Sequence, residues 1–146
     1  MSAGIELIEY IYKNAGMGVQ SIGKLIENTQ REDFKEFLSE QYADYKSITE
    51  ECERIARENS IHLKELGVIS KIESDVMIKM KTIADHSPDT VAEMLMQGSI
   101  MGIIQSIRKI NEYKKENTDN LLDLAKKLLA IEQRNIQECP KWLGVK

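Results

Sequence analysis

Residues 91–110 read VAEMLMQGSIMGIIQSIRKI, a stretch that is apolar on nearly every side when it is wound as a helix. A helix without a polar stripe needs other helices or a partner chain around it, and we expect the rest of the chain to cover it. Gly98 and Gly102 lie one turn apart in this stretch, and each costs about 1 kcal/mol of helix stability relative to alanine. This cost predicts either a close backbone approach or a small pocket beside these glycines.

The composition of the 146-residue chain is typical of one all-helical domain. Only two prolines and few aromatic residues occur, with 42% hydrophobic and 30% charged content, which favours helices over strands. The 24 acidic and 20 basic residues are interspersed and give a net charge of -4. Because a phosphate backbone binds to a basic surface, this balance argues against a nucleic-acid partner.

The chain carries no sequence signal for export or for membrane insertion. Its first residues are acidic and periodic, unlike a secretory signal. Its most apolar run is interrupted by Glu93, Gln97 and Gln105, and a membrane span needs about twenty clean apolar residues. We therefore expect a soluble, cytoplasmic protein that does not contact a membrane, with Cys52 and Cys139 as free thiols.

Apolar residues that recur every three or four positions predict a first helical hairpin over residues 5–59. Its first helix covers residues 5–28, and its second ends near residue 59 and runs antiparallel to the first. Residues 60–87 are too many for a tight turn. We interpret them as a crossover that contains a short helix near residues 69–83.

A second helical hairpin is predicted over residues 88–143. Ser87 supplies an N-cap oxygen and Pro88 a preset first turn, so the third helix starts there. The polar residues 114–119 form a turn, and Pro140 closes the fourth helix. The chain is then a single domain of two antiparallel hairpins joined by a long crossover.

An internal repeat supports this arrangement. Residues 17–25 (MGVQSIGKL) resemble residues 101–110 (MGIIQSIRKI) with one residue inserted. Cys52 and Cys139 also fall near the ends of the second and fourth helices. A pseudo-two-fold axis relating the hairpins would produce this pattern, although apolar helices also match by chance.

This architecture resembles the ferritin-like superfamily of all-α four-helix bundles. Its metal-binding members take a Glu from each of two helices and a Glu-x-x-His from each of the other two to hold two irons. Here His62 and His86 lie outside the middles of the long helices, and Glu132-x-x-Asn135 looks like a Glu-x-x-His with Asn in place of the histidine. The departure implies a member without a diiron site, and we expect neither a metal nor a cofactor.

The hairpin geometry predicts one polar cavity, because residues equally far from a turn lie at the same height. Glu132 and Asn135 then face Ser99 and Gly102, while Gln41 and Tyr45 face the middle of the first helix. The candidate ligand-binding residues are Gln41, Tyr45, Gly98, Ser99, Gly102, Glu132 and Asn135. The alternatives are a self-satisfied polar layer that sets helix register, or a Glu132 that turns to solvent.

Three classes of function fit these features, and no residue is predicted to be catalytic. The first is a non-catalytic structural or interaction module that forms a homodimer or other homo-oligomer through the third helix and the crossover. The second is a protein that binds a small ligand or a single metal ion in the central cavity. The third, a diiron oxidase or peroxidase-type enzyme, is disfavoured because its ligands are missing.

Overall fold

The computed structural model describes residues 3–63, 85–116 and 118–146. Within them it contains four α-helices, one short 3-10 helix and no strand, so this part of the chain is an all-α bundle. The elements are α1 (Ala3–Glu27), α2 (Glu32–Glu58), α4 (Pro88–Tyr113), α5 (Asp119–Glu138) and η1 (Cys139–Trp142). The short helix expected near residues 69–83 lies outside the described residues, as does most of the crossover.

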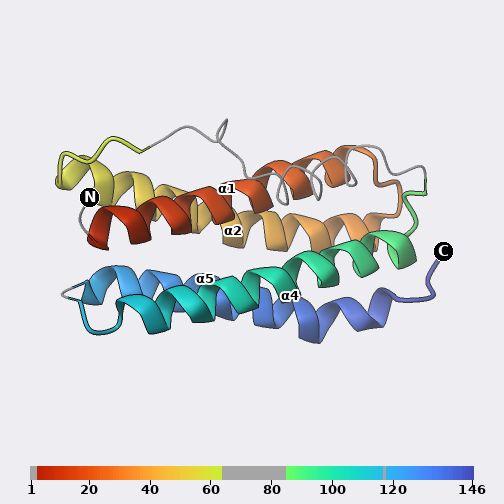
Figure 1. The fold of residues 1–146 in the computed structure, drawn as a ribbon. Helices are drawn as coiled ribbons and strands as arrows, with labels where there is room; N and C mark the ends of the chain where they lie inside the picture. The colour runs from red at the N-terminus through yellow and green to blue at the C-terminus, as the bar shows by residue number, and fades with distance from the viewer. Residues whose placement is uncertain (1–2, 64–84, 117) are drawn as a thin grey trace.

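The helices pack mainly as the pairs α1 with α2 and α4 with α5, each pair joined by a short turn. The chain termini of the second pair place the starts of α2 and α4 at the same end of the bundle. Arg31, just before α2, donates to the carbonyl of Lys146 at 3.5 Å, and the amide of Asp89 in α4 donates to the carbonyl of Val145 at 2.9 Å. Helices α2 and α4 therefore run in the same direction (Figure 1).

The core is built from the apolar stripes that the three-and-four spacing predicts. Leu7, Ile11, Phe34 and Leu38 are fully buried between the helices. Trp142 of η1 closes the end of this core, with its ring centroid 4.9 Å from that of Phe34 in an edge-on contact. Each buried side chain of this kind contributes about 1.5–3 kcal/mol, so the stripes dominate the stability of the bundle.

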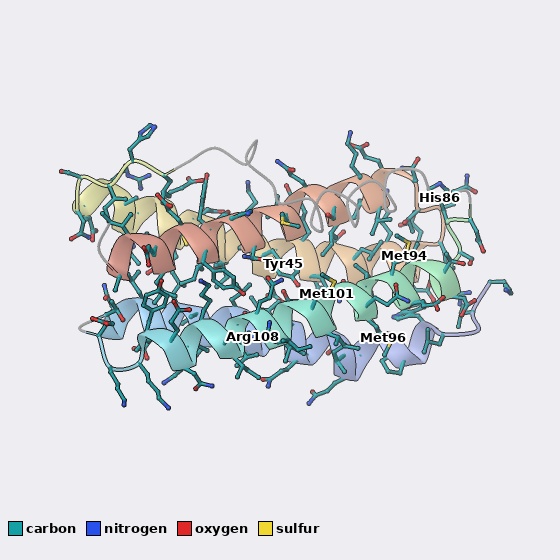
Figure 2. The ribbon with its side chains drawn as sticks, in the orientation of Figure 1. Tyr45, His86, Met94, Met96, Met101 and Arg108 are labelled. Carbon is teal, nitrogen blue, oxygen red and sulfur yellow. The ribbon has the colours of Figure 1, made fainter. Side chains whose placement is uncertain are left out.

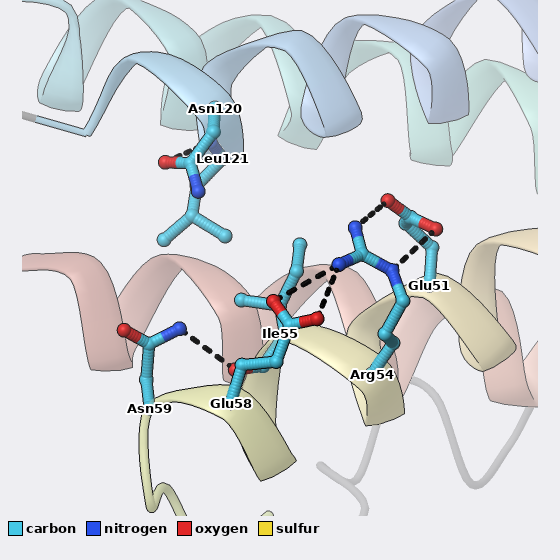
Figure 3. Close-up of polar contacts among 7 residues, drawn as sticks. All are labelled: Glu51, Arg54, Ile55, Glu58, Asn59, Asn120 and Leu121. Carbon is cyan, nitrogen blue, oxygen red and sulfur yellow. Dashed lines mark hydrogen bonds and ion pairs between the residues drawn. The ribbon is translucent and has the colours of Figure 1, made fainter.

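Polar contacts on the surface contribute less. Figure 3 shows Arg54 of α2 between Glu51 and Glu58, its Nη1 lying 2.9 Å from Oε1 of Glu58. At the end of α2 the side-chain amide of Asn59 donates to the carbonyl of Ile55 at 2.8 Å. Exposed ion pairs of this kind are worth about 0–1 kcal/mol each. They extend and terminate α2 but do not determine the fold.

The start of α4 has the predicted cap. Ser87 is the N-cap residue, its Oγ accepts a hydrogen bond from the Thr90 amide at 3.4 Å, and Pro88 occupies the first helical position. Oδ1 of Asp85 accepts from the Ser87 amide at 2.9 Å and holds the cap in place. The helix therefore begins where the sequence indicates, and its first turn has a partner for an otherwise unpaired amide.

We expect Ser87→Ala to lower the free energy of unfolding by about 1 kcal/mol, because the first turn of α4 loses its side-chain acceptor. Urea denaturation measures the change. Ser39→Ala is the control, since the exposed Ser39 hydroxyl only donates to the Lys35 carbonyl of its own helix, and we expect it to change stability by no more than about 0.5 kcal/mol. Equal effects of the two substitutions would contradict the capping role.

One side of α4 is not covered as the sequence predicts. Val91, Leu95 and Ser99 are buried, but the side chains of Ile100, Ile104 and Ile107 are 48%, 47% and 42% exposed. The expectation that the chain surrounds this helix is therefore wrong for one face. Composition cannot distinguish the covered face from the uncovered one when both are apolar.

Candidate functional site: a polar cavity between two helical hairpins

Five polar side chains form a buried cluster near the middle of the bundle. The Tyr45 hydroxyl donates to Oε2 of Glu132 at 2.7 Å. Nδ2 of Asn135 donates to the Tyr45 hydroxyl at 3.1 Å and to Oγ of Ser99 at 3.3 Å. Nε2 of Gln41 donates to Oδ1 of Asn135 at 2.7 Å. Glu132 is 7% exposed and the others at most 5%, so Glu132 does not turn to solvent.

The cluster continues from Gln41 toward the end of α5. Burial raises the pKa of the Cys139 thiol to about 11, and a hydrogen bond with Gln41 opposes part of this rise. The pKa of the buried Cys52 thiol is raised to about 12, again mainly by burial. Both thiols are free, and they lie at opposite ends of the bundle, Cys52 near the end of α2 and Cys139 after α5 (Figure 1). Neither has the lowered pKa of a reactive cysteine.

Two glycines leave space for the two largest members of the cluster. A Cβ atom on Gly102 of α4 would lie 2.6 Å from Oε1 of Glu132. A Cβ atom on Gly18 of α1 would lie 2.7 Å from Cγ of the Tyr45 ring. Both distances are too short for non-bonded atoms. Each hairpin therefore has a glycine on its first helix that admits a bulky polar side chain from its second.

Gly18 is the functional residue that the sequence prediction left out, although the internal repeat contains the signal. The repeat aligns Gly18 with Gly102. Tyr45 and Glu132 are also equivalent, because each precedes a fully buried cysteine by seven positions. The two hairpins thus bring equivalent side chains together, and those side chains hydrogen-bond to each other.

A cavity of about 100 Å³ lies beside this cluster, between α1 and α4. Tyr45, Ser99, Glu132 and Asn135 form its polar end, and Figure 2 shows Tyr45 and Met101 near mid-length of the bundle. The remaining described lining residues are Asn14, Met17, Gly18, Ser21, Ile22, Leu95, Gly98, Met101, Gly102 and Gln105. This volume holds several water molecules or one molecule of a few heavy atoms.

The seven predicted residues take different places in this site. Tyr45, Ser99, Glu132 and Asn135 both join the cluster and line the cavity, while Gln41 joins the cluster through Asn135. Gly98 and Gly102 line the cavity. They differ in the space around them, because a Cβ on Gly98 would meet no atom within 4 Å. The expected small pocket beside the glycines is present.

Glu132 carries the chemistry of this site. Burial raises the pKa of its carboxyl to about 7, and hydrogen bonds from Tyr45 and Ser99 oppose the rise. The pKa of the Tyr45 hydroxyl is raised well above its usual value, first by burial and then by the nearby carboxylate. None of the described residues that line the cavity is Lys, Arg or His. Above neutral pH the site therefore holds a negative charge without a lining cation.

The ligand set offered to a metal ion is poor. Within the described part of the chain, no three His, Cys, Asp or Glu side chains come together. Glu132 is the only carboxylate in the cluster, and Asn135 stands where a Glu-x-x-His would have its histidine. A lone carboxylate with neutral oxygen neighbours suits hydrogen bonding to a singly charged or neutral ligand better than binding of a transition metal.

These features define an all-α bundle with a buried polar cluster and a cavity between its hairpins. Comparison with family models, with curated proteins and with solved structures found no match. Among residues 3–63, 85–116 and 118–146, no helix has the length and apolarity that a membrane span requires.

Proposed function

We propose that the chain is a ferritin-like bundle that binds a small organic cation, such as a primary ammonium ion, in the cavity between α1 and α4. The parallel course of α2 and α4 and the Glu132-x-x-Asn135 spacing support the ferritin-like assignment. One observation carries the binding function. The buried carboxyl of Glu132 lines a cavity whose described lining has no positive side chain.

The lining of the cavity favours an ammonium group with a short apolar end. Oε1 of Glu132 lies beside Gly102, where the missing side chain leaves room for a donor. Asn14 and Gln105 add neutral oxygen acceptors, while Met17 and Leu95 provide apolar surface. The volume of about 100 Å³ limits the ligand to a few heavy atoms, so methylammonium and ethylammonium are suitable probes.

The affinity for these ions should rise with pH, because the cation prefers the ionised form of Glu132. Below the pKa of about 7, each pH unit should change the affinity about tenfold, and above it the affinity should level off. Calorimetric titration with methylammonium at pH 5 and pH 8 should then show a difference of about 100-fold. Tetramethylammonium, which has no N–H donor, should bind less well. Absence of binding by both primary ammonium ions at pH 8 would disprove the proposal.

Glu132→Gln tests the residue that the proposal depends on. The amide keeps an oxygen that accepts from Tyr45 but removes the charge, so we expect at least a tenfold loss of affinity at pH 8 and no pH dependence. Asp123→Asn is the control, since Asp123 is an exposed acid on the same helix. Equal binding by the wild-type and Glu132→Gln chains would place the ion elsewhere and overturn the assignment.

A second proposed function is that of an interaction module, and the uncovered face of α4 favours it. Three isoleucines more than 40% exposed on one helix are unusual for a surface that contacts only water. This function does not exclude ligand binding, because the cavity lies between α1 and α4 and not on the exposed face.

A further inference from the structure

The exposed face of α4 carries a regular stripe of seven side chains. They follow one another at alternating steps of four and three positions, and all seven are exposed. We call them the α4 stripe, which consists of Glu93, Gln97, Ile100, Ile104, Ile107, Asn111 and Lys114. This spacing averages 3.5 residues, which is the period of side chains that face a second helix in a coiled coil.

The chemistry of the α4 stripe reads the same from both ends, with opposite charges at its tips. Ile104 is its centre, and Ile100 and Ile107 flank it at similar distances. Farther out an acid occupies one tip, Glu93, and a base the other, Lys114. A second copy laid antiparallel would therefore place isoleucine on isoleucine and Glu93 beside Lys114.

From this pattern we infer that two copies of the chain associate through the α4 stripe, antiparallel and with a two-fold axis at Ile104. A two-fold contact uses the same surface on both copies, so each favourable pair occurs twice. A parallel pairing would place Glu93 on Glu93 and Lys114 on Lys114, which repel. Gln97 and Asn111 also meet across the axis in the antiparallel register, as amides that can hydrogen-bond.

Sedimentation of the full chain at 1–100 µM tests the association. We expect the wild-type chain to form a dimer and Ile104→Glu to remain a monomer, because the substitution faces two carboxylates at the axis. Ile104 is 47% exposed, so the helical circular dichroism should not change. A monomeric wild-type chain at 100 µM, or a dimeric Ile104→Glu variant, would overturn the inference.

Charge reversal tests the antiparallel register. Glu93→Lys should weaken the dimer at least tenfold, and adding Lys114→Glu to the same chain should restore it, because the pairs are again opposite in sign. Failure of the double variant to recover would overturn the register.

A cysteine at the axis gives a second test. Ile104→Cys should form an intermolecular disulfide under mild oxidation, because the two copies of residue 104 face each other, whereas Ile100→Cys alone should do so slowly. The native thiols do not interfere, since Cys52 and Cys139 are fully buried. Equal rates for the two variants would contradict an axis at Ile104.

Discussion

The Glu132→Gln variant should be more stable than the wild-type chain above pH 7, by up to about 3 kcal/mol, and should lose the pH dependence of stability between pH 4.5 and 7. Burial raises the pKa of Glu132 from 4.5 to about 7 in the folded chain. A group with a raised folded pKa contributes stability that is complete below its unfolded pKa and is lost as the pH rises through its folded pKa. The glutamine has no proton to lose, so its stability should stay level.

Urea denaturation at pH 5 and pH 8, at one protein concentration, measures this effect. The wild-type chain should be less stable at pH 8, while the two chains should differ little at pH 5. Asp123→Asn should follow the wild-type profile, because Asp123 is exposed on the same helix. Parallel profiles for the wild-type and Glu132→Gln chains would mean that Glu132 ionises without cost. Such a carboxyl would destabilise the bundle at the pH where we propose that it binds a cation.

We expect Gly18→Ala to lower the free energy of unfolding by about 2 kcal/mol, although alanine is the better helix former by about 1 kcal/mol. The new methyl group would lie within 2.8 Å of Cγ, Cδ1 and Cδ2 of Tyr45. These atoms form the root of the ring and cannot move unless α2 or the Tyr45 rotamer shifts. That shift would also disturb the hydrogen bond from Tyr45 to Glu132.

Gly23→Ala is the matched control for this substitution. Gly23 lies on the same helix, and its Cβ would make an ordinary contact of 3.5 Å with Cε2 of Tyr42. It should therefore raise stability by about 1 kcal/mol through helix propensity alone. The same urea denaturation compares both variants, and a gain in stability for both would show that α1 and α2 are not in close contact at Gly18.

Much of the fold follows from local features of the sequence. The three-and-four spacing predicts the helices, and Ser87 with Pro88 marks the start of α4. The candidate cluster was also predictable, because a short turn sets the heights of the residues on both of its helices. This is why Glu132 and Asn135 could be placed opposite Ser99 and Gly102 before the structure was known.

Two features depend on geometry that no single stretch of sequence contains. The role of Gly18 arises from the separation of α1 and α2, and a glycine inside an apolar helix does not reveal which neighbour approaches it. The exposure of Ile104 depends on how α4 is rotated about its axis. A helix apolar on all sides has no moment to predict that rotation, so the cover over it must be read from the packed bundle.

The glycine clearances at Gly18 and Gly102 also bear on how the site distinguishes the two ends of a ligand. A bundle of two identical halves would place identical groups face to face, and two carboxylates there would repel each other. Here one half contributes a phenol that donates and the other a carboxylate that accepts. This broken symmetry gives the site a polarity, with its negative group on the α5 side, so an asymmetric ligand would bind in one orientation.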